Sequence, residues 1–211
     1  MLLEFTLMNN TDFNSELNNT SIAGKATSQK LPGDIAMWFF ILVELTVFAI
    51  FFMGFAITEN MNIAMFVDGK DKLHKTAGLI NTVALITSSF FVALSLLSLQ
   101  KNREKQAVTF LFSALTFALV YIVVKLWEYQ ALFNQGIDIE TNTFFTLYFL
   151  ITAFHFMHIL LGMVILTYML ISTLKGRYSR NEDISGFESG ACYWHMVDLL
   201  WIILFPLIYI I

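Results

Sequence analysis

Long apolar runs alternate with short polar stretches along this chain of 211 residues. Five of the runs are long enough to cross a bilayer, whose hydrocarbon core of roughly 30 Å needs about 20 helical residues. They cover residues 35–57, 76–99, 107–129, 144–173 and 191–211. Because backbone polar groups in lipid must be satisfied within the segment, each run predicts an α-helix. The pattern therefore predicts an all-α, polytopic membrane protein with a bundle of five transmembrane helices.

The amino-acid composition agrees with this class. Hydrophobic residues make up 57% of the chain and charged residues 13%, whereas soluble domains contain about 45–50% and about 25%. The single cysteine, Cys192, excludes an internal disulfide framework and a thiolate-based zinc or iron–sulfur site within this chain. No basic patch with interleaved aromatic residues is present, so we expect no nucleic-acid partner.

The residues before the first apolar run have a different character. Residues 1–30 are rich in Asn, Ser and Thr, and this composition predicts a disordered polar tail. The first eight residues carry Glu4 and no basic residue, so they do not predict a signal peptide. We therefore expect a tail at 1–30 and a transmembrane domain at 31–211.

The distribution of lysine and arginine predicts the orientation in the membrane. One side collects most of the basic residues, in the tail and in the second-to-third and fourth-to-fifth loops: Lys25, Lys30, Lys101, Arg103, Lys105, Lys175, Arg177 and Arg180. The opposite side has only Lys70, Lys72 and Lys75. We therefore expect a cytoplasmic N-terminus and a C-terminus on the opposite side.

Two ionisable residues, His195 and Asp198, lie inside the last apolar run. A spacing of three residues places both side chains on one helix face. Ionisable groups at membrane depth are costly unless they are paired, so the pair indicates either a functional site or a deliberate packing contact. We favour a contact that joins helices.

Glu44 lies near the middle of the first run, among phenylalanine and aliphatic residues. No cation lies at helical spacing from it, so the carboxyl group is either neutral or paired with another helix. We favour a neutral acid hydrogen-bonded within the bundle over proton handling or a contact with lipid. A network of Glu44, a histidine and Asp198 across helices is geometrically feasible, because these residues lie at similar depth.

His155 and His158 lie one turn apart in the fourth run. Imidazole pairs at this spacing can bind zinc or copper, but further ligands would have to come from other helices. A haem would likewise need a histidine on a facing helix, and His195 alone could supply it. We therefore favour hydrogen bonds between helices for this pair and expect no metal site. No Gly-rich phosphate loop or nucleophile elbow is present, so we also expect no catalytic or cofactor-binding residues.

Lys125 and Glu128 close the third run, again three residues apart. They can pair within their own helix, and Lys125 can reach the membrane surface with its long side chain. We predict a solvated pair at the interface.

Aromatic and small residues predict how the helices sit and pack. Trp38, Trp127, Tyr193 and Trp194 lie toward the ends of runs, where amphipathic rings prefer the headgroup level. Gly162 predicts a close approach between two helices. Pro206 removes one backbone hydrogen bond, so we expect a bend near the end of the last helix.

Five blocks of residues, in order, resemble subunit III of the haem-copper oxidases, the cytochrome c oxidase type. The blocks are Gly33…Trp38…Glu44…Phe48, Leu79-Ile80-Asn81-Thr82…Ser88-Ser89, Glu128-Tyr129, Phe154-His155-Phe156-Met157-His158…Gly162, and Gly186-Phe187-Glu188 leading into Tyr193-Trp194-His195-Met196-Val197-Asp198-Leu199-Leu200-Trp201. The last two blocks are the most specific. The resemblance extends from about residue 31 to the C-terminus.

The resemblance implies a five-helix form of a fold that often has seven helices. It implies a non-catalytic subunit that supports respiratory electron transport and proton uptake, with no cofactor of its own. Haem and copper are expected in a catalytic partner of the subunit I type, and phospholipid between the helices. By position, the characteristic buried polar, lipid or interface residues are Glu44, Glu128, His155, His158, Glu188, Trp194, His195 and Asp198.

The resemblance also gives expectations for the partner complex and for the membrane in which the chain lies. A shorter branch of the family accompanies nitric oxide reductases, and the Lys125-Leu126-Trp127-Glu128-Tyr129 segment is similar to that branch. A stand-alone transporter or proton pathway is a more distant alternative. In a bacterium, the resemblance places the chain in the inner membrane, with a periplasmic C-terminus.

Overall fold

A computed structural model describes residues 35–178 and 184–210. The described residues form six helices: α2 (Ile35–Met61), α3 (Ile63–Lys72), α4 (Lys75–Gln100), α5 (Glu104–Asn134), α6 (Thr143–Leu174) and α7 (Ser185–Tyr209). All except α3 are long and apolar enough to cross a membrane. The predicted fold class, an all-α protein with five transmembrane helices, is confirmed. The tail predicted at 1–30 lies outside the described residues, as do Lys25, Lys30 and Arg180.

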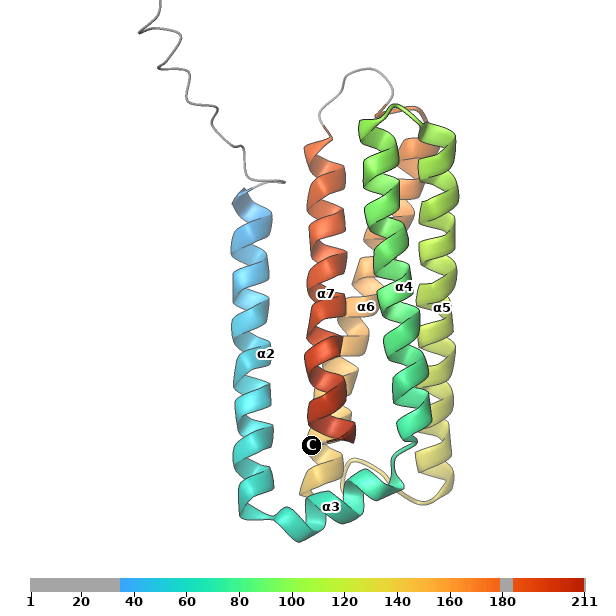
Figure 1. The fold of residues 1–211 in the computed structure, drawn as a ribbon. Coiled ribbons are helices and arrows are strands. Elements are labelled where there is room, and N and C mark those ends of the chain that lie inside the picture. The colour runs from blue at the N-terminus through green and yellow to red at the C-terminus, as the bar shows by residue number, and fades with distance from the viewer. Residues whose placement is uncertain (1–34, 179–183, 211) are drawn as a thin grey trace, which may run out of the picture. The chain divides into compact units, whose positions relative to one another are not determined.

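The long helices run side by side, and four of them form a closed bundle (Figure 1). In this bundle α4 packs against α5 and α7, and α6 also packs against α5 and α7. The remaining membrane helix, α2, lies outside the four and contacts α6 and α7. It therefore holds the most peripheral place among the spans.

The short helix α3 lies across one end of the bundle (Figure 1), where it contacts α2 and α6. Its buried Gly69 meets the Phe144 ring, and its Lys70 pairs with Glu59 of α2. Two exposed ion pairs, Lys72–Asp68 at 2.7 Å and Lys75–Asp71 at 3.2 Å, occupy the outer side. The sequence did not predict this helix, because ten residues with interleaved charges are too short and too polar to resemble a span.

Two hydroxyl groups bind α4 to α5. Ser88 donates a hydrogen bond of 2.8 Å to the Ala114 carbonyl oxygen, and Ser95 donates one of 3.0 Å to that of Ala107. Small side chains let transmembrane helices approach closely enough for such bonds. The contact between α4 and α5 consequently extends along most of both helices.

Glycine brings α6 against α7. A Cβ atom at Gly162 would lie 2.7 Å from the Trp194 ring, and one at Gly190 would lie 2.5 Å from the sulfur of Met169. Both distances are shorter than van der Waals contact, so neither position has room for a side chain without rearrangement. The close approach predicted at Gly162 is confirmed.

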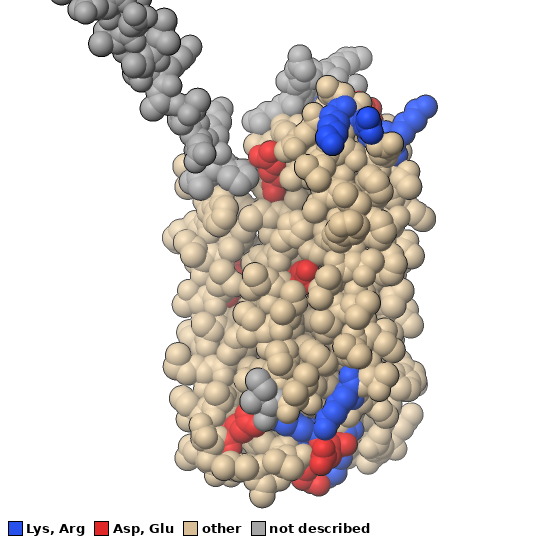
Figure 2. Space-filling model, viewed as in Figure 1, with Lys and Arg blue, Asp and Glu red and all other residues tan. Residues whose placement is uncertain are grey.

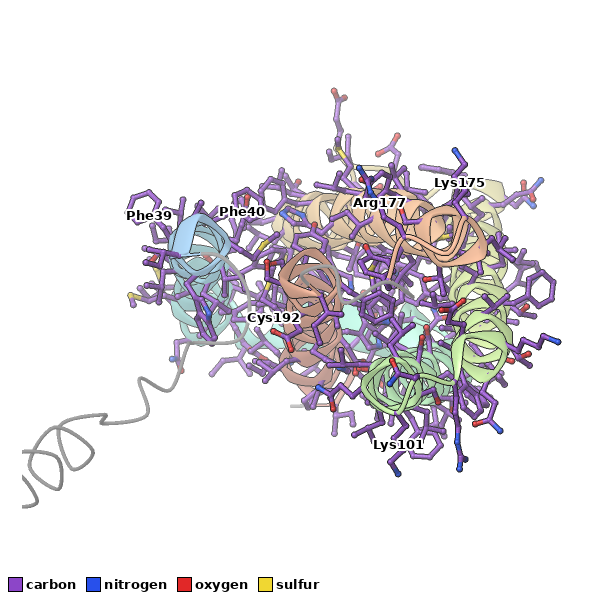
Figure 3. All side chains as sticks on the ribbon, turned by 90° about the horizontal axis from the view of Figure 1, so that it is seen from above. Phe39, Phe40, Lys101, Lys175, Arg177 and Cys192 are labelled. Atoms are coloured by element: carbon purple, nitrogen blue, oxygen red, sulfur yellow. The ribbon has the colours of Figure 1, made fainter. Side chains whose placement is uncertain are left out.

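Charged side chains gather at the two ends of the described unit, and the wide band between them is mostly apolar, with a few acidic atoms visible at mid-height (Figure 2). The α4–α5 turn, with Lys101, Arg103 and Lys105, lies at the end opposite α3 (Figure 1). Seen along the bundle, Lys101, Lys175 and Arg177 point outward at this same end (Figure 3). The predicted distribution of these basic residues between the two sides is therefore confirmed for the described loops.

Candidate functional site

The predicted polar residues form separate groups between the helices, and the first joins α2 to α6. Glu44 Oε2 lies 2.9 Å from His158 Nε2. The His158 and Glu44 side chains are only 9% and 17% exposed. This contact supplies one partner of the network expected across helices, whereas Asp198 takes part in a different group.

The hydrogen bonds of His158 define where its protons lie. Its Nδ1 is 2.7 Å from the Phe154 carbonyl oxygen, which can only accept a hydrogen bond, so Nδ1 carries a proton. The Nε2–Oε2 contact then needs one further proton, shared between the imidazole and Glu44. The pair is either a neutral acid on a neutral imidazole or a carboxylate on an imidazolium. In both forms its net charge is zero, which lowers the cost of placing it at membrane depth.

The second group surrounds Lys125 and joins α5, α6 and α7. The Lys125 ammonium donates hydrogen bonds to Glu128 at 3.0 Å, to the Tyr148 hydroxyl at 3.1 Å and to the Tyr209 hydroxyl at 2.9 Å. These bonds use all three of its donors. Tyr209 in turn donates to the Glu128 carboxylate at 2.8 Å. We call these four residues, Lys125, Glu128, Tyr148 and Tyr209, the Lys125 network.

The prediction that Lys125 and Glu128 form a solvated surface pair is wrong. Both side chains are 0% exposed. The physical reason is that α5 continues to Asn134, so Lys125 lies about 13 Å from the helix end at a rise of about 1.5 Å per residue. Four aromatic rings also lie within 5.6 Å of its ammonium, with centroid distances beginning at 4.9 Å for Tyr148. The charge is stabilised by its ion pair and by these ring faces.

The third group joins α4 to α7. His195 Nδ1 shares a short hydrogen bond with the Ser89 hydroxyl. The Asp198 carboxyl lies near the same hydroxyl, and its Oδ1 atom has no hydrogen-bond partner among the described residues. The helical spacing that placed His195 and Asp198 on one face therefore directs both at one residue of α4. The geometry is that of a contact between two helices.

His155 does not form the hydrogen bond between helices that we predicted. Its side chain is fully buried, and neither ring nitrogen has a hydrogen-bond partner among the described residues. The ring instead stacks on Trp201 at a centroid distance of 5.2 Å and meets Tyr121 edge-on at 6.1 Å. The prediction rested on the one-turn spacing from His158. It is wrong because the rings of Phe48 and Trp201, rather than polar groups, face the His155 ring.

The aromatic residues divide between the surface and the core. Trp127 is 54% exposed on the outside of α5, and its headgroup position stays a prediction. The predicted headgroup position is wrong for Tyr193 and Trp194, each 1% exposed. Their helix begins at Ser185, several residues before the predicted start at 191, so both lie more than a turn inside it. Trp194 fills the space beside Gly162, and Tyr193 donates a 3.3 Å hydrogen bond to the His158 carbonyl oxygen.

Glu188 lies in the first turn of α7, where it is half-buried and forms no ion pair with the described residues. The structure does not bring it to the other predicted residues. Pro206 lies inside α7, near its end, and the bend expected there stays a prediction.

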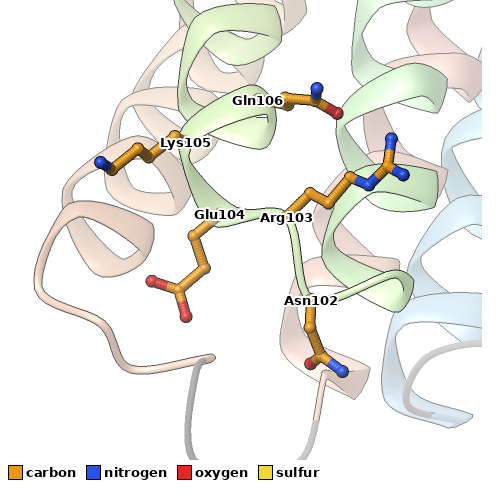
Figure 4. Close-up of a pocket in the computed structure, with 5 residues that line it drawn as sticks. All are labelled: Asn102, Arg103, Glu104, Lys105 and Gln106. Atoms are coloured by element: carbon orange, nitrogen blue, oxygen red, sulfur yellow. The ribbon is translucent and has the colours of Figure 1, made fainter.

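The described residues contain no group of three or more His, Cys, Asp or Glu side chains placed to hold a metal ion. An open hollow lies at the α4–α5 turn (Figure 4), lined by Asn102, Arg103, Glu104, Lys105 and Gln106. None of these belongs to the predicted site residues. The three groups of polar side chains between the helices are therefore separate from this hollow.

The family model for cytochrome c oxidase subunit III matches residues 3–211. The chain belongs to the cytochrome c oxidase subunit III family. Among relatives, cytochrome c oxidase subunit 3 of Synechocystis sp. is 27% identical over 208 residues, which cover 97% of this chain and 88% of the relative. Cytochrome bo(3) ubiquinol oxidase subunit 3 of Buchnera aphidicola is 25% identical over 203 residues, covering 96% of this chain and 95% of the relative.

A third relative has a different organisation. The heme-copper oxidase subunit I+III of Aeropyrum pernix is 26% identical over 181 residues, which cover 83% of this chain but only 22% of that protein. The region similar to this subunit III family member is thus a minor part of a much longer chain.

Several polar residues of this subunit III family member escaped sequence analysis. Tyr148 and Tyr209 of the Lys125 network lie near helix ends. From the sequence alone, a tyrosine at such a position is expected at the membrane–water interface and not in a buried hydrogen-bond network. Tyr121 lies among apolar residues with nothing to mark it, and Trp201 is marked only as the last residue of the fifth family block. The one available signal was the spacing of three between Lys125 and Glu128, which predicts a pair but not its burial.

Proposed function

We propose that this chain is the non-catalytic subunit III of a haem-copper terminal oxidase. The observation that carries the proposal is the family match, which extends over residues 3–211. The three groups of polar side chains support it, because each is used to join helices within the chain. In this role the subunit binds a catalytic partner and supports its electron transport and proton uptake, while haem and copper reside in that partner.

The partner we propose is a subunit I-type chain. The heme-copper oxidase subunit I+III of Aeropyrum pernix supports this choice, because a region similar to this chain lies in one protein named for both subunits. A nitric oxide reductase partner is not favoured, since the relatives above are cytochrome c or ubiquinol oxidase subunits. A stand-alone proton pathway is also not favoured, because the Glu44–His158 contact joins α2 to α6, whereas the Ser89–His195 contact joins α4 to α7.

We further propose the bacterial inner membrane as the location, with the α4–α5 turn facing the cytoplasm. The basic residues of the described loops support this orientation through the positive-inside rule. Phospholipid would contact the outer face of α2, where Phe39, Leu42 and Ile50 are 60–71% exposed. Figure 3 shows Phe39 pointing away from the bundle.

Purification from native membranes tests the main proposal. A tagged chain, extracted in mild detergent, should bring with it a haem-bearing subunit, detected by its absorption spectrum. Recovery of the chain alone would contradict the proposal. As a test of the partner, deletion of the gene should impair oxygen consumption and leave nitric oxide consumption unchanged. The opposite pattern would favour the nitric oxide reductase branch.

A further inference from the structure

Buried polar atoms with no hydrogen-bond partner among the described residues belong to five side chains, and three of these side chains have no exposed surface. They are Asn81 of α4, Tyr121 of α5 and His155 of α6, all 0% exposed. The atoms concerned are both amide atoms of Asn81, the Tyr121 hydroxyl and both ring nitrogens of His155. Nothing in the Lys125 network or in the Glu44–His158 pair accounts for them.

The register between α4 and α5 places Asn81 opposite Tyr121. The bonds from Ser95 to Ala107 and from Ser88 to Ala114 lie seven residues apart on each of these antiparallel helices. A further step of seven residues along the same helix faces reaches Asn81 on α4 and Tyr121 on α5. Because seven residues make almost two full turns, the facing relationship is retained at this step.

Trp201 of α7 packs against both Tyr121 and His155. Its ring lies 5.2 Å from the Tyr121 ring and 5.2 Å from the His155 ring. Its indole nitrogen donates a 3.0 Å hydrogen bond to Thr82, the neighbour of Asn81 in sequence. Tyr121 and His155 therefore both pack on one indole, which also binds α4 at the residue next to Asn81.

Their chemistry is matched by water. A buried polar group without a partner costs about 1–3 kcal/mol, so five such atoms together would be a large penalty. Asparagine, tyrosine and neutral histidine each offer both a donor and an acceptor. A water molecule offers the same combination and, when buried, makes about three hydrogen bonds to groups of this kind. Lys125 adds no competing donor, because its three protons are already bound.

We propose that Asn81, Tyr121 and His155 form a binding site for ordered water inside the bundle. The bound water links α4, α5 and α6 through hydrogen bonds that the side chains do not make to one another. It adds a further polar contact between the helices of the described bundle.

A density map of the complex purified from native membranes, at a resolution that resolves water, tests the site directly. We expect a peak about 2.6–3.2 Å from polar atoms of at least two of the three side chains. A map with no such peak would overturn the proposal. So would a peak about 2.0–2.2 Å from a His155 nitrogen, because that distance indicates a metal ion.

Substitutions in the same complex give an independent test. If water bridges the groups, Tyr121→Phe should lower the unfolding midpoint of the subunit by about 2–4 °C, because it removes a used hydrogen bond. Asn81→Leu should act similarly, and the double variant should lose less than the sum of the two single shifts. Tyr193→Phe is the matched control, because its hydroxyl donates to the His158 carbonyl oxygen. When it is combined with Tyr121→Phe, the midpoint should fall by the sum of the two single shifts. A rise in midpoint with Tyr121→Phe, or additive shifts for Tyr121 and Asn81, would overturn the proposal.

Discussion

Glu44 and His158 share one proton across a 2.9 Å contact that ties the peripheral helix α2 to α6. The Phe154 carbonyl oxygen holds the other imidazole nitrogen in its protonated form. Phenylalanine rings, including Phe48 and Phe154, surround the pair at centroid distances of 5.4 and 4.8 Å from His158. The pair therefore adds a polar contact to the aromatic packing of Phe48 and Phe51 on Phe154, which also joins α2 to α6.

Replacing Glu44 tests which partner carries the shared proton. A glutamine amide can donate to His158 Nε2 as a neutral acid would, so Glu44→Gln should retain assembly with the partner. Glu44→Leu leaves the imidazole unpaired and should weaken the attachment of α2 by about 1–3 kcal/mol. The measurement is the yield of partner subunit recovered with each tagged variant. Loss of assembly in Glu44→Gln would show that the pair is a carboxylate on an imidazolium.

The Lys125–Glu128 pair should be far more sensitive to the loss of one member than a surface pair. Lys125→Met leaves the Glu128 carboxylate buried without its cation, so we expect a loss of about 3–5 kcal/mol in stability. Changing both residues, to Met and Gln, removes the isolated charge and should restore part of that loss. Thermal unfolding of the purified complex measures both effects.

An exposed pair on α3 provides the control for this comparison. Lys72 and Asp68 lie 2.7 Å apart, with side chains 45% and 65% exposed. Because solvent screens such pairs, Lys72→Met should change stability by at most about 1 kcal/mol. Equal effects of Lys125→Met and Lys72→Met would contradict the burial of the Lys125 network.

The sequence was sufficient to predict the spans because each is a long apolar run, and length and hydropathy alone limit what such a run can form. It was also sufficient to predict that the Glu44 carboxyl group is hydrogen-bonded within the bundle and that Gly162 marks a close approach. It could not predict the burial of Lys125. That burial depends on hydroxyl groups from α6 and α7 and on where α5 ends, and neither is encoded near Lys125 itself.

His155 and His158 show the same limit within one helix. One turn separates them, and periodicity treats them alike. Their environments differ because α2 presents Glu44 to one histidine, while α7 presents the Trp201 ring to the other. Which residue of a neighbouring helix faces a given position is decided by packing between helices, and a single sequence does not reveal that register.

Removing the Tyr209 hydroxyl should detach the end of α7 from the Lys125 network. This hydroxyl accepts from Lys125 and donates to Glu128, so Tyr209→Phe removes two charge-assisted hydrogen bonds. We expect a loss of about 2–4 kcal/mol, measured as a lower unfolding midpoint of the complex. Tyr168→Phe is the control, because its hydroxyl accepts only an exposed bond from Arg177 and its loss should be close to neutral. Equal midpoints for the two variants would show that Tyr209 contributes only its ring.

A methyl group at Gly162 should push α6 away from α7. The added Cβ atom would lie 2.7 Å from the Trp194 ring, and Trp194 is too tightly packed, at 1% exposed, to move aside. Overpacking of this kind costs about 1–3 kcal/mol, so Gly162→Ala should lower the unfolding midpoint of the complex. Gly54→Ala is the matched control, since a Cβ atom there meets nothing within 4 Å and alanine favours the helix. We therefore expect Gly54→Ala to raise the midpoint slightly, and a Gly162→Ala variant that does the same would show that α6 and α7 tolerate a wider spacing.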